Sequence, residues 1–270
     1  MPPTLPVALT IAGSDSGGGA GIQADLKTFQ AFGVFGTSAI TAITVQNTLG
    51  VSGVHAIPIE TVRAQIEAVA SDLPPAAVKT GMLATAPLVR TVARTIRELR
   101  LPNFVLDPVM VATSGDRLLD RDAEHTILDE LLPLATVVTP NLDEAAILTG
   151  RPVADLEGMR RAAEWLVERG AGAVLLKGGH LTTEILTDYL WDGREWREWQ
   201  HPRLETSSTH GTGCTLSAAV AAGLAHGHAL PDAVDAALGF VQRAIKAAPG
   251  LGRGHGPLNH MVDQLPAEPL

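Results

Sequence analysis

Short runs of β-forming residues alternate along this chain with segments of helical periodicity. Strands are predicted at VALTIAG, SAITAITVQ, AVKTG, FVLDPVM, TVVTPN and AVLLKGG, and helices at 21–32, 60–71, 86–99, 121–132, 141–149 and 155–169. Strand, helix and strand in succession are typical of crossover connections in a parallel sheet. The pattern therefore predicts a mainly parallel sheet with helices on both faces, where ligands bind beyond the carboxyl ends of the strands.

One segment, EILTDYLWDGREWREWQ, interrupts this alternation. Two extended runs flank Asp192-Gly193, which is a strong hairpin signal, so we expect a small antiparallel hairpin at the sheet edge. Its tryptophans, Trp191, Trp196 and Trp199, are suited either to a base-stacking platform or to covering a core, and the spacing favours the core.

Composition restricts the classes of partner and compartment. The 270 residues suffice for one large domain, predicted over 1–270, and a net charge of -9 without a basic run argues against nucleic-acid binding. The first apolar run is too short for a membrane span, and a single cysteine excludes an intrachain disulfide, so we expect a cytoplasmic protein. The two helices after the hairpin should be well buried, and the tail after Pro257 peripheral.

The stretch GSDSGGGAGIQADLKT, residues 13–28, follows the first predicted strand and begins a helix. Its glycines permit close approach of a ligand to the backbone, and Asp15, Asp25 and Lys27 bring polar groups to the same strand end. It lacks the G-K-[ST] ending of a Walker A loop and the G-x-G-x-x-G dinucleotide spacing. We interpret it as a ligand loop, with a tight structural turn as the alternative.

Polar residues follow three further predicted strands. Asp107 ends FVLD, Asn141 and Glu144 follow TVVTP, and Lys177 ends VLLK. Carboxylate and amide oxygens suit hydrated Mg²⁺, and a lysine suits a phosphate. Alone, Asn141 and Glu144 are equally explained as a helix cap with its capping-box partner.

The chain's only cysteine lies in THGTGCTLSA, residues 209–218. The amides of Gly211, Thr212, Gly213 and Cys214 can converge at a helix N-terminus, which favours anions and lowers the pKa of a cysteine. Cys214 is also explained as a small buried hydrophobe. No HExxH or Cys/His cluster indicates zinc, and His210 near Cys214 does not by itself establish a hydrolase pair.

Taken together, AGSDSGGGAGIQADLKT, VQNT, VKTGML, DPVM, TPNLDEA, LLKGGH and HGTGCTLSAA resemble the ribokinase-like superfamily over roughly residues 6–257. The resemblance is closest to its hydroxymethylpyrimidine/phosphomethylpyrimidine kinase branch in thiamine biosynthesis. It implies a three-layer α/β/α fold and transfer of the ATP γ-phosphoryl, with Mg²⁺, to 4-amino-5-hydroxymethyl-2-methylpyrimidine and then to its monophosphate. Most of the superfamily has aspartate where this branch, like this chain, has cysteine.

The resemblance also implies roles for individual residues. The pyrimidine pocket would contain Gly13, Asp25, Gln46, Met82 and Val109. The ATP side would use Asp107, Asn141, Glu144, Lys177 and Thr209, with Asp107 and Glu144 as the Mg²⁺ ligands. The catalytic group would be Cys214 with Gly211, Thr212 and Gly213, the cysteine acting as general base.

Three other functions remain open at this point. Pyridoxal/pyridoxine kinase activity on the same scaffold is the nearest alternative, since related enzymes phosphorylate a hydroxymethyl group on a similar flat heterocycle. A Cys-dependent hydrolase would form a covalent acyl-enzyme and need no ATP, and a sensor would bind ligand without releasing ADP. A homodimer is compatible with the sequence, which does not determine the oligomeric state.

Overall fold

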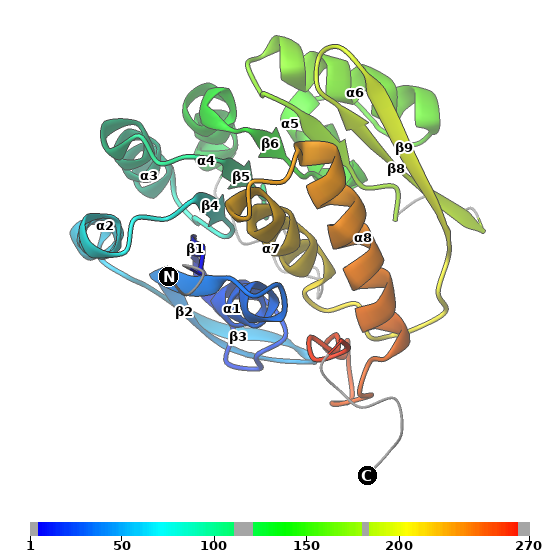
Figure 1. Cartoon of the computed structure of the whole chain (residues 1–270), viewed down its shortest axis with the longest axis horizontal. Coiled ribbons are helices and arrows are strands. Elements are labelled where there is room, and N and C mark those ends of the chain that lie inside the picture. The colour runs from blue at the N-terminus through cyan, green and yellow to red at the C-terminus, as the bar shows by residue number, and fades with distance from the viewer. Residues whose placement is uncertain (1–4, 111–120, 180–183, 264–270) are drawn as a thin grey trace.

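The computed structural model describes residues 5–110, 121–179 and 184–263, and its centre is a nine-stranded sheet (Figure 1). The strand order is β3-β2-β1-β4-β5-β6-β7-β8-β9, and the pairs from β2 to β7 in that order are parallel. The strands are β1 (Val7–Ser14), β2 (Phe35–Asn47), β3 (Gly50–Ala56), β4 (Ala77–Thr80), β5 (Phe104–Leu106), β6 (Val137–Val138), β7 (Val174–Leu176), β8 (Ile185–Trp191) and β9 (Trp196–Pro202).

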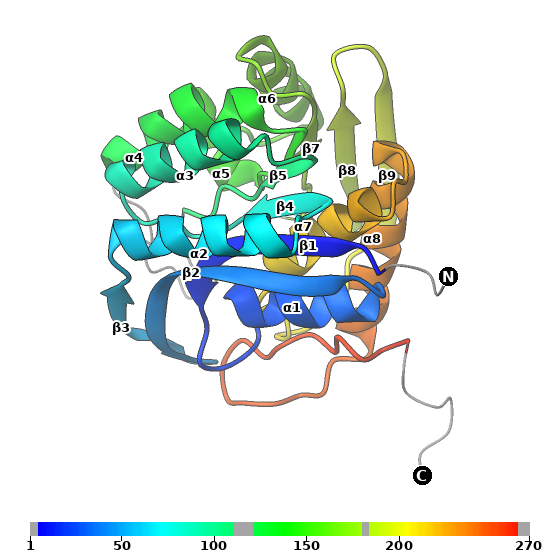
Figure 2. The same cartoon turned by 60° about the vertical axis from the view of Figure 1, so that its left-hand side comes forward.

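Helices cover both faces of the sheet, as Figure 2 shows from a second direction. One face carries α2 (Ile59–Asp72), α3 (Ala86–Leu99), α4 (Arg121–Thr126), α5 (Leu142–Thr149) and α6 (Leu156–Glu168). The other carries α1 (Gly21–Ala31), α7 (Thr212–Ala225) and α8 (Leu230–Lys246). The predicted three-layer α/β/α fold is confirmed.

Side-chain alternation along the central strands builds one core on each face. Leu9 and Ile11 of β1 pack among α2 and α3, whereas Ala8 packs with Phe29 of α1. Successive side chains of a strand point to opposite faces, so a strand buried on both sides is apolar throughout. This explains why the central strands read as continuous apolar runs.

The antiparallel hairpin is confirmed as β8 and β9, which form the sheet edge beside β7. Its tryptophans are partly buried against the two cores, and the Trp191 and Trp196 rings stack at 4.6 Å. The core-covering interpretation is therefore correct. None of the described helices combines the length and the apolar character needed to cross a bilayer.

The structure differs from the sequence prediction at three elements. A second edge strand, β3, pairs antiparallel with β2, and its glycine-containing sequence GVSGVHA concealed it. The helix expected over 121–132 is present, but it is α-helical only to Thr126, then widens into a π turn and ends in a tighter 3₁₀ turn that contains Pro133. The tail is not peripheral where it is described, because Leu258 and His260 are buried.

Candidate active site

The carboxyl ends of the parallel strands open into a cavity of about 750 Å³. Polar side chains gather here because parallel strands present all their carboxyl ends at one edge, where crossover loops begin. All the predicted site residues except Asp25 line this cavity: Gly13, Gln46, Met82, Asp107, Val109, Asn141, Glu144, Lys177, Thr209, Gly211, Thr212, Gly213 and Cys214.

The turn before α7 supplies a set of backbone amides. Gly211 is the N-cap of α7 with φ of 81°, and a Cβ there would collide with the carbonyl oxygen of Gly19. Only glycine fits this left-handed, tightly packed position. The first-turn amides, from Thr212 to Cys214, have no acceptor within the helix and border the cavity, which makes this turn suited to an anion.

Cys214 lies where the N-terminal ends of α7 and α1 meet, with its side chain partly exposed. Burial raises the pKa of its thiol to about 11, against the opposing effects of the Lys79 ammonium and the Gly21 amide. The expectation of a lowered pKa is therefore wrong. Desolvation of the thiolate outweighs the favourable interactions with Lys79 and the Gly21 amide, and a pKa of about 11 corresponds to a neutral thiol at pH 7.

Asp107 follows β5 and is held by hydroxyls and two ammonium groups. Its carboxylate accepts hydrogen bonds from Ser217 Oγ at 3.0 Å and Thr139 Oγ1 at 3.4 Å. Lys177 Nζ lies 3.7 Å from Oδ1 and Lys79 Nζ lies 3.9 Å from Oδ2. These contacts keep a nearly buried carboxylate at the cavity wall.

Asn141 and Glu144 form the capping box of α5, so the structural interpretation of this pair is correct. Glu144 also faces the cavity, with Oε2 lying 3.9 Å from Lys177 Nζ. Burial raises the pKa of Glu144 to about 7, although Lys177 opposes this. Glu144 thus both stabilises the start of α5 and lines the cavity. His180, the last residue of LLKGGH, lies outside the described residues.

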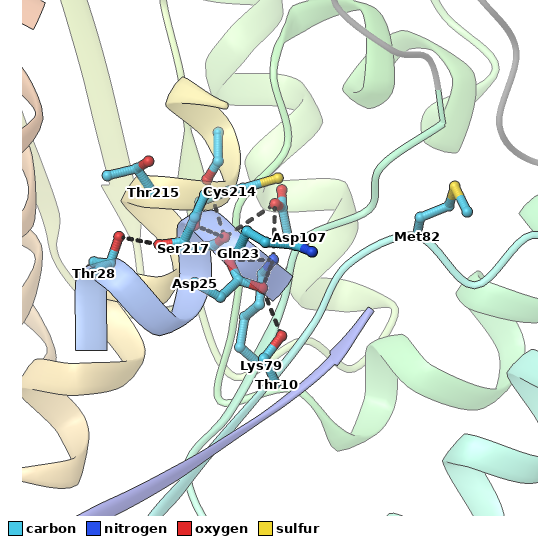
Figure 3. Close-up of polar contacts among 12 residues, drawn as sticks. Thr10, Gln23, Asp25, Thr28, Lys79, Met82, Asp107, Cys214, Thr215 and Ser217 are labelled. Atoms are coloured by element: carbon cyan, nitrogen blue, oxygen red, sulfur yellow. Dashed lines mark hydrogen bonds and ion pairs between the residues drawn. The ribbon is translucent and has the colours of Figure 1, made fainter. Parts of the chain in front are cut away.

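Asp25 is not at the cavity surface, contrary to the expectation of a pyrimidine contact. Its carboxylate is completely buried, accepts a hydrogen bond from Thr10 Oγ1 at 2.6 Å, and pairs with Lys79 Nζ at 2.9 and 3.0 Å. Figure 3 shows this pair beside Asp107 and Cys214, while Met82 stands apart. Asp25 therefore supports the cavity wall from within.

Three charged residues near the site were not assigned a role from the sequence. Lys79 is the buried partner of Asp25, and His210 Nε2 lies 2.8 Å from Asp15 Oδ2 beside the cavity. A lysine inside the apolar strand AVKTG was the available signal, since a lysine is almost never fully buried without a partner. His210 contacts Asp15 and Gln46, which gives it a role other than the hydrolase pairing considered from the sequence.

Part of the cavity lining consists of residues that carry no sequence motif. They come from α5, β8, the segment after β9, and α8: Ile147, Leu186, Arg203, Leu204, Thr206, Gln242 and Ile245. Their mixed apolar and polar character fits a flat base and sugar. Among the residues that the structure describes, no three His, Cys, Asp or Glu side chains come together to hold a metal by themselves.

An amide-lined turn and a lysine beside one cavity at the strand ends of a mainly parallel sheet are the features expected of a small-molecule phosphotransferase of ribokinase-like fold. The model of the family described as phosphomethylpyrimidine kinase matches residues 15–259. The chain belongs to this family.

Individual relatives agree with this assignment. A hydroxymethylpyrimidine/phosphomethylpyrimidine kinase of Rhizobium meliloti is 54% identical over 257 residues, covering 94% of this chain and 96% of the relative. One of Bacillus subtilis is 51% identical over 256 residues, covering 94% of each. The ADP complex of Bacillus subtilis pyridoxal kinase superposes with a TM-score of 0.91 and 41% identity, covering 97% of this chain and 100% of that one. The predicted family, fold and kinase activity are confirmed.

Proposed function

We propose that the chain transfers the γ-phosphoryl of ATP to the hydroxymethyl group of 4-amino-5-hydroxymethyl-2-methylpyrimidine, and then phosphorylates the monophosphate to the pyrophosphate, in thiamine biosynthesis. The observation that carries this proposal is that Gln46 and Met82 line the same cavity as the turn before α7, which contains Gly211 and Cys214. A nucleotide and a small heterocycle can both be accommodated there. Their reacting atoms would meet at the N-terminus of α7.

The pyrimidine would bind between the first strands. Gly13, Gln46, Met82 and Val109 line this part of the cavity. A Cβ at Gly13 would come within 2.9 Å of the Met82 side chain, so glycine at this position lets Met82 pack closely against the backbone of the cavity wall. Gln46 supplies polar recognition and Met82 apolar contact, which matches an aminopyrimidine.

The phosphates of ATP would lie against Lys177, Thr209 and the amides of the turn before α7. Mg²⁺ is usually held by one or two carboxylates together with substrate phosphates, and the buried pair Asp107 and Glu144 fits that requirement. When bound, Mg²⁺ would neutralise charge on the transferring phosphoryl oxygens. Asn141 would keep Glu144 in place through the capping box.

Phosphoryl transfer asks the protein mainly to align the attacking oxygen and stabilise charge. Lys177 and the turn amides would stabilise the charge on the phosphoryl group. The cavity would align the attacking oxygen by holding both substrates. We assign Cys214 as the general base that accepts the hydroxyl proton. A pKa of about 11 leaves only about one thiol in 10³ ionised at pH 8, so the rate should follow the thiolate fraction.

The test is ADP release measured with hydroxymethylpyrimidine, its monophosphate and pyridoxal. We expect the highest kcat/KM for the first two. We expect Gln46→Ala to weaken pyrimidine binding by about 1–3 kcal/mol with an unchanged melting curve. Unchanged kcat/KM in that variant would remove Gln46 from the pocket.

Pyridoxal/pyridoxine kinase activity is the second candidate, favoured by the 0.91 TM-score to a pyridoxal kinase. A higher kcat/KM for pyridoxal than for either pyrimidine would make it the principal activity.

We place the enzyme in the cytoplasm because its only cysteine, Cys214, is a free thiol. Fractionation of cells that express it tests this location.

A further inference from the structure

The Asp15 carboxylate is a hydrogen-bond hub between the glycine-rich loop and the turn before α7. Oδ1 accepts from the Gly17 amide at 2.8 Å, and Oδ2 accepts from the Gly19 and Ala20 amides at 3.0 and 2.8 Å. His210 Nε2 lies 2.8 Å from the same Oδ2. Although burial opposes it, the hydrogen bonds from His210 and the loop lower the pKa of Asp15, so the group is an ionised acceptor.

This arrangement determines the proton on His210. A carboxylate can only accept, so His210 Nε2 must carry a hydrogen and donate it, whether the ring is neutral or charged. His210 is 7% exposed and borders the cavity. Because Nε2 carries this one hydrogen, it cannot accept a hydrogen bond from any other neighbour.

The terminal amide of Gln46 lies between this donor and an acceptor. In the structure Gln46 Nε2 lies 3.4 Å from His210 Nε2, and Gln46 Oε1 lies 3.2 Å from Thr44 Oγ1. Thr44 Oγ1 gives its single hydrogen to the Ser14 carbonyl at 2.7 Å, so it offers Gln46 only lone pairs. Turning the amide of Gln46 over, so that its oxygen faces His210 and its nitrogen faces Thr44, satisfies both neighbours.

We propose that Asp15, acting through His210, is a positioning residue that fixes the orientation of the Gln46 amide and so the group that Gln46 presents to the pyrimidine. One amide hydrogen is taken by Thr44, and the second points to the cavity as a donor. A ring nitrogen of the pyrimidine is the matching acceptor. The proposal rests on the proposed contact between Gln46 and substrate.

A double-mutant cycle tests this coupling. Asp15→Asn, Gln46→Ala and the double variant are compared by calorimetric Kd for hydroxymethylpyrimidine, by KM for ATP and by melting curves. We expect Asp15→Asn to raise the Kd about tenfold in the parent, and less than twofold when Gln46→Ala is already present, with the KM for ATP nearly unchanged.

His210 provides an independent route if Asp15→Asn fails to fold. His210→Leu removes the donor and leaves the loop hydrogen bonds of Asp15 intact, so it should raise the Kd in the same non-additive way. His210→Gln restores an N–H donor and should recover most of the affinity. The control is Gln23→Ala, which removes the hydrogen bond from the Asp15 amide to Gln23 Oε1 and should leave the Kd unchanged.

The outcomes separate the inference from the proposed function. If Gln46→Ala leaves the Kd unchanged, its contact with substrate is wrong and the inference falls with it. If Gln46→Ala weakens binding but the Asp15 and His210 effects are additive with it, only the coupling is wrong. Non-additive losses with rescue by His210→Gln support it.

Discussion

Lys79→Met should destabilise the fold in a way that depends on pH. Lys79 and Asp25 are both completely buried, and the ammonium contacts both carboxylate oxygens. Burial alone would lower the pKa of Lys79, but the charges of Asp25 and nearby anions outweigh it and raise the pKa, so the lysine stays charged. Methionine keeps most of the volume of the side chain and removes the charge. Asp25 then retains only the hydrogen bond from Thr10.

The loss in free energy of unfolding depends on whether Asp25 becomes protonated in the variant. Breaking a buried ion pair by removing one partner costs about 3–5 kcal/mol. Protonation of Asp25 limits that cost, because holding a group of ordinary pKa 3.8 protonated at pH 7 costs about 4 kcal/mol, and at pH 5 about 1.5 kcal/mol. With its folded pKa raised, the variant loses stability as the pH rises above 3.8.

Urea unfolding at pH 5 and at pH 7 measures the free energy of unfolding of the parent and of Lys79→Met. The matched control is Lys79→Met combined with Asp25→Asn, which has no carboxyl at this position to titrate. We expect the loss in the double variant to differ little between the two pH values. Equal losses at pH 5 and pH 7 in Lys79→Met itself would refute the view that Asp25 is an ionised partner of this lysine.

Further predictions concern the site. The parent kcat/KM should rise about tenfold per pH unit from pH 7 to 9 if the Cys214 thiolate is the base; a plateau below pH 8 contradicts this. Cys214→Ala and Cys214→Ser should lose about two to four orders of magnitude in kcat, and Cys214→Asp less; near-parental turnover in Cys214→Ala would leave only a packing role. Gly211→Ala should destabilise the fold by several times the roughly 1 kcal/mol expected for Gly227→Ala, which has the same φ of 81° but open space; equal melting shifts would disprove the clash. Glu144→Gln should be more stable than the parent by up to about 3 kcal/mol at pH 8 and by little at pH 4.5, because the raised pKa of Glu144 costs stability above its unfolded value; a pH-independent difference would exclude that pKa.

Local sequence patterns predict the central strands and most helices because each is either apolar throughout or periodic. They fail where the pattern is weak. The glycines of β3 hide its alternation, and the edge strand is held by pairing with β2. The tail is buried because His260 meets Thr215 of α7, with Nε2 2.9 Å from Oγ1, a contact between residues 45 positions apart.

The same distinction applies to the site. Asp107 and Lys177 could be placed from sequence because each directly follows a strand, and Glu144 because it lies in the first turn of the helix after β6, and the sheet brings these strand ends together. Asp25 follows no strand, and its position depends on a lysine 54 residues away. The pKa of Cys214 depends on how much water the surrounding elements exclude, which no motif encodes.

The charge arrangement around Lys177 bears on how the proposed site would receive ATP. Asp107 and Glu144 both lie within 4 Å of its ammonium, at 3.7 and 3.9 Å. An entering phosphate therefore competes with two carboxylates for the same cation. Withdrawal of either carboxylate's charge, by protonation of Glu144 near pH 7 or by a cation bound at the pair, frees Lys177 for the phosphate. In the proposed ATP site the acidic pair would therefore control the phosphate contact of Lys177, although its own charge would repel the ligand.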